Sequence, residues 1–387
     1  MRFIHIYILM LTFAPYFVKG QNQYVRVKAK SGDGIYVLLG RYGLDRSQCN
    51  IDRFCELNKL TLKSYLITDK TYLLPIEKYV YDGNSIESSL NRQDSYLAKQ
   101  VERYNSSMCS FKLKPEDHRV GSKELWCPHH LLACNNSNRE EFVPNDRSFE
   151  IFGKKYAEVA LEDKSLAGAV YYIVSGHGGP DPGAMANESG KRICEDEYAY
   201  DIALRLGREL LRHGAIVHFI TRDEDGIRDN ELLNCDSDEV VKGDLTIPFN
   251  QSERLKQRSD IINELYRKYK NKGIDYQRTI EIHIDSRKAN QRVDLFFYHF
   301  PNSSMGKSLA ELLYKTVKSK YAIYRKNGEY DGSVTARDLH VLREAIPTTV
   351  FIEVANIQNA QDRKRIVLPQ NRQFLAEWLA EGLLKDY

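Results

Sequence analysis

Three polar residues stand where buried strands of the chain are expected to end. His177 follows an apolar, β-branched run and opens a loop dense in Gly and Pro. His283 and Glu353 stand near the ends of two later apolar runs, at residues 279–284 and 349–354. Because the carboxyl ends of parallel strands meet at one edge of an open α/β sheet, we expect the three side chains to converge there.

These residue types are suited to binding zinc. Two neutral imidazoles, from His177 and His283, and one carboxylate would give Zn²⁺ three protein ligands and leave the fourth position for water, as in catalytic zinc sites. Glu195, in the first turn of a predicted helix, is the candidate carboxylate, and Glu197 is a rival. With Glu195 on the metal, Glu353 is left free to act on the water.

At this point the sequence resembles a family, the zinc-dependent N-acetylmuramoyl-L-alanine amidases of bacterial cell walls. The resemblance runs from about Gly168 to the C-terminus and keeps the family's motif order. The matching segments are Gly-His-Gly-Gly-Pro-Asp-Pro-Gly at 176–183, Glu195 ahead of Ile202 and Ala203, Thr221-Arg222-Asp223, Ile282-His283, Val341-Leu342-Arg343, and Glu353 ahead of Asn356.

The resemblance implies a cofactor, a reaction and a partner. It implies Zn²⁺ on His177, Glu195 and His283, with Glu353 moving a proton from water to the leaving nitrogen. The bond cut joins the lactyl group of N-acetylmuramic acid to the L-Ala of the stem peptide, so the partner is peptidoglycan, glycan strand and stem peptide together. A protein activator stays unknown. The residues by themselves reach only a zinc hydrolase, so a zinc peptidase acting within the stem and a non-catalytic wall-binding protein remain alternatives.

The family pattern is not matched everywhere. Asp196 and Glu197 follow the metal Glu, where the family usually has Lys, and Ile284-Asp285-Ser286 shifts the pattern after the second His. In some members a helix inserted after that His plugs the site. Only the short segment 285–291 is present here, which predicts no plug at that place.

The second half of the chain, residues 164–387, reads as one α/β catalytic domain. Its expected fold is a twisted, mostly parallel central sheet flanked by helices, with right-handed βαβ crossovers. Helices are predicted at 195–213, 255–269, 303–321 and 372–384. The apolar face of the last helix, which includes Phe374 and Trp378, is expected to pack into the core.

A smaller α+β module is predicted at residues 24–76. Its order is strand, helix, helix, strand, and Gly32-Asp33, Asn58 and Leu74-Pro75 resemble a diverged LysM domain, a family that binds glycans containing N-acetylglucosamine. Residues 77–163 give no clear pattern and are expected to be a linker or poorly defined region.

Export of the chain, expected from its N-terminal segment, implies an oxidising setting that favours disulfides, and seven cysteines leave at least one unpaired or pairing between chains. Cys49 with Cys55 and Cys194 with Cys235 are predicted disulfides, from proximity in sequence and in the expected fold. The segment Cys127-Pro-His-His-Leu-Leu-Ala-Cys134 admits a metal site or a disulfide, and the oxidising setting favours the disulfide.

Residues 1–20 read as a secretory signal peptide, with a basic start and an apolar core too short for a comfortable membrane span. An uncleaved anchor is the alternative. Cleavage would leave an exported, periplasmic or envelope-associated protein with no stable membrane anchor. A formal net charge of +3 gives no argument for nucleic acid as a partner.

An acidic insertion, residues 223–244, follows the second predicted strand of the catalytic domain. Such a run is usually a solvated loop. Binding of Ca²⁺ and covering of the substrate groove are the functional alternatives.

Overall fold

The computed structural model describes residues 23–45, 47–133, 143–325 and 330–387. The predicted signal peptide and Cys134 lie outside these residues. In the part of the chain that is described, none of the helices combines the length and the apolar character needed to cross a membrane.

A six-stranded sheet forms the centre of the C-terminal half of the chain, in the order β13-β12-β14-β11-β4-β7. Every neighbouring pair is parallel except β12 with β14, so the predicted mostly parallel sheet is confirmed. Its inner strands read as continuous apolar runs because both faces of the sheet are covered. The strands are β4 (Val170–Ser175), β7 (Ile216–Phe219), β11 (Gln277–Asp285), β12 (Phe296–His299), β13 (Ser333–Ala336) and β14 (Thr348–Asn356).

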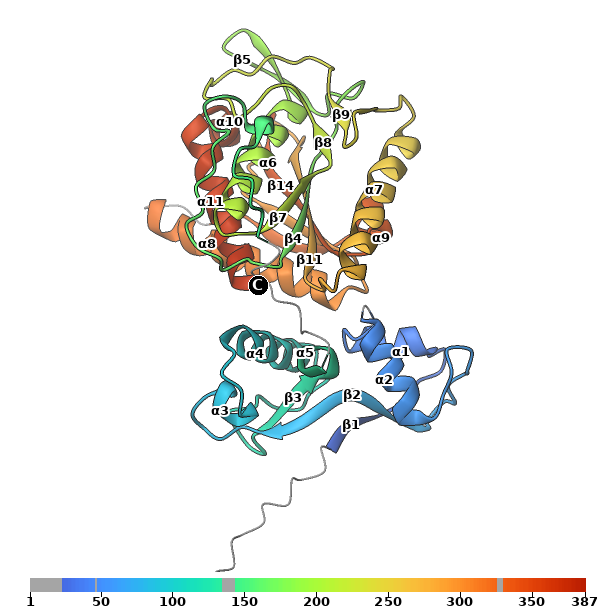
Figure 1. Cartoon of the computed structure of the whole chain (residues 1–387). Helices are drawn as coiled ribbons and strands as arrows, with labels where there is room; N and C mark the ends of the chain where they lie inside the picture. The colour runs from blue at the N-terminus through green and yellow to red at the C-terminus, as the bar shows by residue number, and fades with distance from the viewer. Residues whose placement is uncertain (1–22, 46, 134–142, 326–329) are drawn as a thin grey trace, which may run out of the picture.

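Helices cover the two faces of this sheet (Figure 1). One face packs against α6 (Glu195–Arg212), α8 (Ser304–Tyr324), α10 (Ala360–Val367) and α11 (Pro369–Asp386). The other face packs against α7 (Gln251–Asn271) and α9 (His340–Glu344). Alternate residues of β4 belong to the two cores: Tyr171 to the first and Tyr172 to the second.

The last helix does not bury the whole of its predicted apolar face. Leu375, Leu379 and Leu383 are buried, as expected. Phe374 is 45% exposed and stacks on Trp378 with ring centroids 6.2 Å apart. Tyr324 of α8 stacks on both rings, so the three aromatic side chains form a group at the edge of the core.

The N-terminal module begins with the predicted strand, helix, helix, strand. These are β1 (Gln23–Lys28), α1 (Ile35–Arg41), α2 (Gln48–Asn58) and β2 (Thr71–Val80), with the strands antiparallel. The boundary expected at residue 76 falls inside β2. The second half of β2 pairs with β3 (Glu124–Pro128), so one three-stranded sheet extends through both predicted regions.

Much of the region expected to be a linker is therefore folded onto the module. Besides β3 it contains α3 (Ile86–Leu90), α4 (Ser95–Ser110), α5 (His129–Ala133) and the short 3₁₀ helix η2 (Glu150–Phe152). Helices α3 and α4 pack with β3 around a small core of their own. The longest of these helices, α4, buries Leu97, Ala98 and Val101 in that core.

The N-terminal region contains an internal structural repeat, marked by equivalent hydrogen bonds of two asparagines. At the end of α2, the Asn58 amide donates to the Leu73 carbonyl (2.8 Å) and accepts from the Leu73 N–H (2.8 Å). In α4, the Asn105 amide makes the same pair of bonds with Trp126, at 2.9 Å each. Both amides also donate to a carbonyl one turn earlier in their own helix. We conclude that residues 23–128 contain two similar strand-helix-helix-strand units that share β2.

The cysteine predictions had mixed outcomes. Cys194 and Cys235 form a disulfide, as predicted. The Cys49–Cys55 pair is wrong: Cys49 is disulfide-bonded, but Cys55 is a free thiol. Both lie on α2, where six residues span about 9 Å of helix axis, and a disulfide needs Cα atoms within about 7 Å. Cys127 is also free and is buried in β3, so it forms no disulfide with Cys134.

Candidate metal centre

The structure brings His177, Glu195 and His283 together at the carboxyl edge of the central sheet. His177 follows β4, Glu195 is the first residue of α6, and His283 lies near the end of β11. A ligand atom of each lies within 4.8 Å of the other two. Glu197, the rival carboxylate, is instead ion-paired with Arg228 (Nη1 to Oε2, 2.7 Å).

Glu195 lies between the two imidazoles. Its Oε1 is 2.9 Å from His283 Nδ1 and its Oε2 is 3.3 Å from His177 Nε2. The N–H groups of Ile284 and Ala184 donate to the same two oxygens, each at 2.8 Å. The carboxylate is thus held on both oxygens by backbone donors, and it faces two ring nitrogens.

The glycine-rich loop makes room for these side chains. A Cβ at Gly176 would lie 2.2 Å from the His283 ring, and a Cβ at Gly183 would lie 2.7 Å from both Glu195 and His177. His177 itself has φ of 64°, a left-handed conformation that is rare for residues other than Gly and clusters at functional sites. Gly is therefore required at positions 176 and 183 of the motif, because a side chain at either position would clash with the proposed metal ligands.

Two carboxylates hold the far sides of the imidazoles. Asp181 Oδ2 lies 3.0 Å from His177 Nδ1, and Glu281 Oε1 lies 3.1 Å from His283 Nε2. Such pairs fix the tautomer and orientation of a ligating His, and leave its other nitrogen facing inward. Sequence reasoning missed both roles, although Glu281 stands two residues before His283 and so faces the same side of β11.

Two arginines of helix α7 bond to the loop that carries His177 and Asp181. Arg254 Nη2 lies 2.6 Å from Asp181 Oδ2, and the Arg258 guanidinium donates to the His177 carbonyl. Arg258 is almost fully buried. These bonds connect α7 to the loop that carries His177.

The pKa shifts describe a tightly paired cluster. Burial would raise the pKa of Glu195, but bonds from His177 and His283 hold it well below its usual range. Burial would lower the pKa of His283, but its bonds to Glu195 and Glu281 raise it to about 10. The pKa of His177 is raised as well, by Asp181 and Glu195 acting against burial. Without a metal, His283 is therefore protonated at neutral pH.

Glu353 lies on β14 directly across from His283 on β11. Burial raises the pKa of its carboxyl group to about 8, and the charges of His283, Glu195 and His177 act on it. Among the described residues its Oε2 has no hydrogen-bond partner, although the atom is buried. At least one oxygen of this carboxyl group is thus unengaged beside the paired cluster.

A cavity of about 190 Å³ opens onto the two imidazoles. It is lined by Arg254, Phe351 and His340 among others, with the Phe351 ring stacked on His283 (centroids 4.3 Å apart). His340 Nε2 also lies 3.2 Å from Ser259 Oγ. The described segment between β11 and β12, residues 286–295, contains no helix, in agreement with the absence of a plug expected there.

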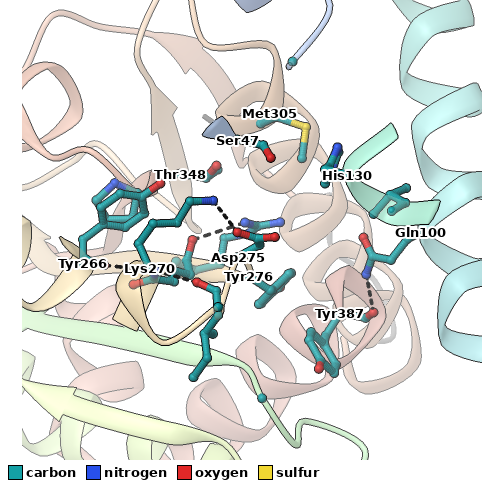
Figure 2. A pocket seen from close by; sticks show the side chains of 18 of the residues that line it. Ser47, Gln100, His130, Tyr266, Lys270, Asp275, Tyr276, Met305, Thr348 and Tyr387 are labelled. Atoms are coloured by element: carbon teal, nitrogen blue, oxygen red, sulfur yellow. Dashed lines mark hydrogen bonds and ion pairs between the residues drawn. The ribbon is translucent and has the colours of Figure 1, made fainter. Parts of the chain in front are cut away.

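Another cavity, of about 140 Å³, lies at the opposite end of the sheet (Figure 2). Its lining joins the N-terminal module, including His130, to Gln277 and Thr348 at the amino ends of β11 and β14. Figure 2 shows Gln100 donating to the Tyr387 carbonyl (2.7 Å) across this boundary. It lies at the edge opposite the candidate metal-binding cluster of His177, Glu195 and His283, so we assign it to the contact between the two parts of the chain.

Comparisons with known proteins point to one family. A family model described as N-acetylmuramoyl-L-alanine amidase matches residues 172–385, more than half of the chain. The germination-specific N-acetylmuramoyl-L-alanine amidase of Bacillus subtilis (strain 168) is 23% identical over 230 residues, which are 57% of this chain and 81% of that protein.

Solved structures with similarity to this chain include two further amidases. The N-acetylmuramoyl-L-alanine amidase from Clostridium difficile 630 is 20% identical, with 56% of this chain and 95% of that chain covered and a TM-score of 0.42. The catalytic domain of CwlV, an N-acetylmuramoyl-L-alanine amidase from Bacillus (Paenibacillus) polymyxa var. colistinus, is 20% identical. The match covers 56% of this chain and 96% of that chain, with a TM-score of 0.41.

Proposed function

Because this chain belongs to the N-acetylmuramoyl-L-alanine amidase family, we propose that it cleaves the amide between N-acetylmuramic acid and the L-Ala of the stem peptide, with zinc as its cofactor. The observation that carries the proposal is the convergence of His177, Glu195 and His283 beside Glu353. The substrate class follows from the family, and the reaction type follows from these side chains.

The donor set fits zinc. Nε2 of His177, Nδ1 of His283 and the Glu195 carboxylate face one another, and the other ring nitrogens are held by Asp181 and Glu281. Nitrogen and carboxylate ligands in a set of three are those of catalytic zinc sites. Zinc bound here would supply a Lewis acid that polarises the scissile carbonyl and acidifies water.

Glu353 is the proposed general base and acid. Its ionised carboxylate accepts a proton from the attacking water as the carbon–oxygen bond forms. The same group then gives that proton to the leaving nitrogen as the carbon–nitrogen bond breaks. Burial raises the pKa of Glu353 in the metal-free site to about 8, and a raised pKa suits a carboxyl group that must both take and release a proton.

Digestion of purified peptidoglycan by the zinc-loaded protein tests this function, with products identified by mass spectrometry. Intact stem peptides that begin with a free L-Ala amine are the expected product. Fragments cut within the stem would select a zinc peptidase instead. Binding to the wall without release of any product would select the wall-binding alternative.

Asp181 and Glu281, the outer carboxylates that bond to the far sides of the two imidazoles, allow a more specific prediction. Asp181→Asn and Glu281→Gln should each weaken zinc binding about 10- to 100-fold, because each loses the charge that orients a ligating His. Zinc affinity is measured by competition with a chromophoric chelator. Glu188→Gln, at a half-buried carboxylate that pairs with Arg363 (2.5 Å), is the matched control and should bind zinc like the wild type. If Asp181→Asn and Glu281→Gln both bound zinc as tightly as the wild type, these two carboxylates would have no role in zinc binding.

The remaining assignments are proposals of the same kind. We propose that residues 164–387 are the catalytic unit, and that the module from residue 24 is LysM-like and binds the glycan strand. Its strand-helix-helix-strand order supports that fold. We also propose that the protein acts outside the cytoplasm, where its substrate lies, after removal of residues 1–20.

A further inference from the structure

A second group of carboxylates is buried next to the metal-binding cluster, on its other side. Asp196 and Glu197 follow Glu195 in α6, and Glu239 comes from the acidic insertion, just before β9 (Val240–Val241). All three are at least 95% buried, with exposures of 2%, 1% and 4%. One oxygen from each lies within 4.8 Å of the other two. The solvated loop expected from the acidic composition is therefore wrong for Glu239.

Two of these carboxylates are oriented by the backbone and yet incompletely bonded. The Glu197 N–H donates to Asp196 Oδ1 (3.0 Å), and the Gly179 N–H donates to Glu239 Oε2 (2.7 Å). The second oxygens, Asp196 Oδ2 and Glu239 Oε1, are buried and have no hydrogen-bond partner within the described parts of the chain. A buried, unpartnered carboxylate oxygen is costly unless a cation or a proton meets it.

The positive charge of the nearby Arg228 is not directed at the two unpartnered oxygens. Arg228 pairs with Glu197 Oε2 and with Asp225, so its charge is directed to the outside of the group. No ion pair involves Asp196 or Glu239 in the described residues. Asp223 and Asp236 add further carboxylate oxygens within 4.8 Å of Glu239. Several carboxyl groups and a single guanidinium are therefore gathered in one enclosed place.

We propose that Asp196, Glu197 and Glu239 bind a divalent cation that prefers oxygen ligands, with Ca²⁺ the best fit. Two oxygens on one Ca²⁺, each about 2.3–2.6 Å from it, can be up to about 5 Å apart, which agrees with the separation found here. All three proposed ligands are carboxylate oxygens, which suit Ca²⁺ and Mg²⁺ better than zinc. A cavity of about 510 Å³, lined by Asp236 and Glu239, opens beside the group.

The proposed cation would join three segments that carry the metal-binding cluster. Glu239 holds Gly179, two residues after His177, and Asp196 follows Glu195 directly. The Cys194–Cys235 disulfide fastens the insertion to the start of α6 at the same place. Occupancy should therefore stiffen the loop that carries His177 without touching substrate.

Calorimetric titration of CaCl₂, and in parallel MgCl₂, into the zinc-saturated full-length protein tests this site, together with thermal unfolding. We expect saturable binding of Ca²⁺ and a rise in Tm of about 5 °C at a Ca²⁺ concentration roughly 100-fold above Kd. Asp196→Asn and Glu239→Gln should weaken binding about tenfold or more and remove the Tm response. Glu239→Gln keeps an oxygen that can accept from the Gly179 N–H.

Glu224→Gln is the matched control, because Glu224 is an exposed carboxylate of the same insertion. It should bind Ca²⁺ as the wild type does. Binding by the wild type and not by the two buried variants supports the site. The proposal is overturned if neither cation binds, or if Glu239→Gln binds as tightly as the wild type. It is also overturned if Glu239→Gln alone raises Tm while Ca²⁺ leaves the wild type unchanged, since the carboxyl groups would then share a proton.

Discussion

Glu353→Gln is expected to reduce the rate of amide cleavage about 10²- to 10⁴-fold, the usual contribution of a positioned general base and acid. The amide has almost the shape of the carboxyl group but can neither accept nor return the proton. Zinc content should stay that of the wild type, because Glu353 is not among the residues that converge as ligands. The measurement is kcat for release of stem peptides, with bound zinc determined by mass spectrometry.

The same substitution should stabilise the metal-free protein at alkaline pH. The folded-state pKa of Glu353, about 8, lies above the usual value for an unfolded Glu, about 4.3. The unfolded chain thus loses this proton first, and the contribution of Glu353 to folding stability is present below pH about 4 and is lost as the pH rises to about 8. Glu353→Gln removes that loss, so its Tm should exceed the wild-type Tm near pH 8.

An inactive Glu353→Gln protein that is folded and stable separates a role in catalysis from a role in folding. Glu377→Gln, at an exposed position of α11, is the control and should keep both the activity and the Tm of the wild type. Near-normal activity of Glu353→Gln would falsify its role as the base and would leave the proton transfers to another group.

The position of the main site could be predicted from the sequence because it depends on topology. His177, His283 and Glu353 each close an apolar strand, and parallel strands with helical crossovers must end at one edge of the sheet. Glu195 stands at the start of a helix that faces the same edge, and the family resemblance, through the spacing to Ile202 and Ala203, favoured it over Glu197. None of this required knowledge of contacts distant in sequence.

The outer carboxylates and the second acidic group could not be predicted in the same way. Asp181 and Glu281 differ from other acidic residues only in the distances at which they meet His177 and His283. Glu239 belongs to a run whose composition favours exposure, and it is buried because a disulfide and the Gly179 N–H hold the insertion against α6. Tertiary contacts of this kind leave no periodic signal in the sequence.

The N-terminal region shows a related difficulty. A boundary at residue 76 is reasonable for one strand-helix-helix-strand unit, but β2 continues to Val80 because a second unit uses its other half. The repeat is visible in the paired bonds of Asn58 and Asn105. The helices of the two units differ in length, which hides the repeat from inspection of the sequence alone.

His283→Ala should prevent zinc binding at micromolar metal and abolish amide cleavage. The loss of affinity should exceed the roughly 10- to 100-fold expected for an outer carboxylate, because a ligand atom itself is removed. Zinc content after dialysis against a zinc buffer is the measurement. His213→Ala removes an imidazole that pairs with Asp163 (2.9 Å) far from the cluster, and should keep both zinc and activity.

Zinc binding to the wild type should release protons at neutral pH. The pKa of His283 is raised to about 10 in the metal-free cluster, so the nitrogen that faces Glu195 must lose its proton before it can bind a metal. The affinity of the wild type for zinc should therefore increase as the pH rises toward 10. Titration calorimetry in two buffers of different ionisation enthalpy counts the protons, and at least about one per zinc is expected at pH 7. Zinc uptake without proton release would show that His283 is neutral beforehand or is not a ligand, and the proposed ligand set would have to be revised.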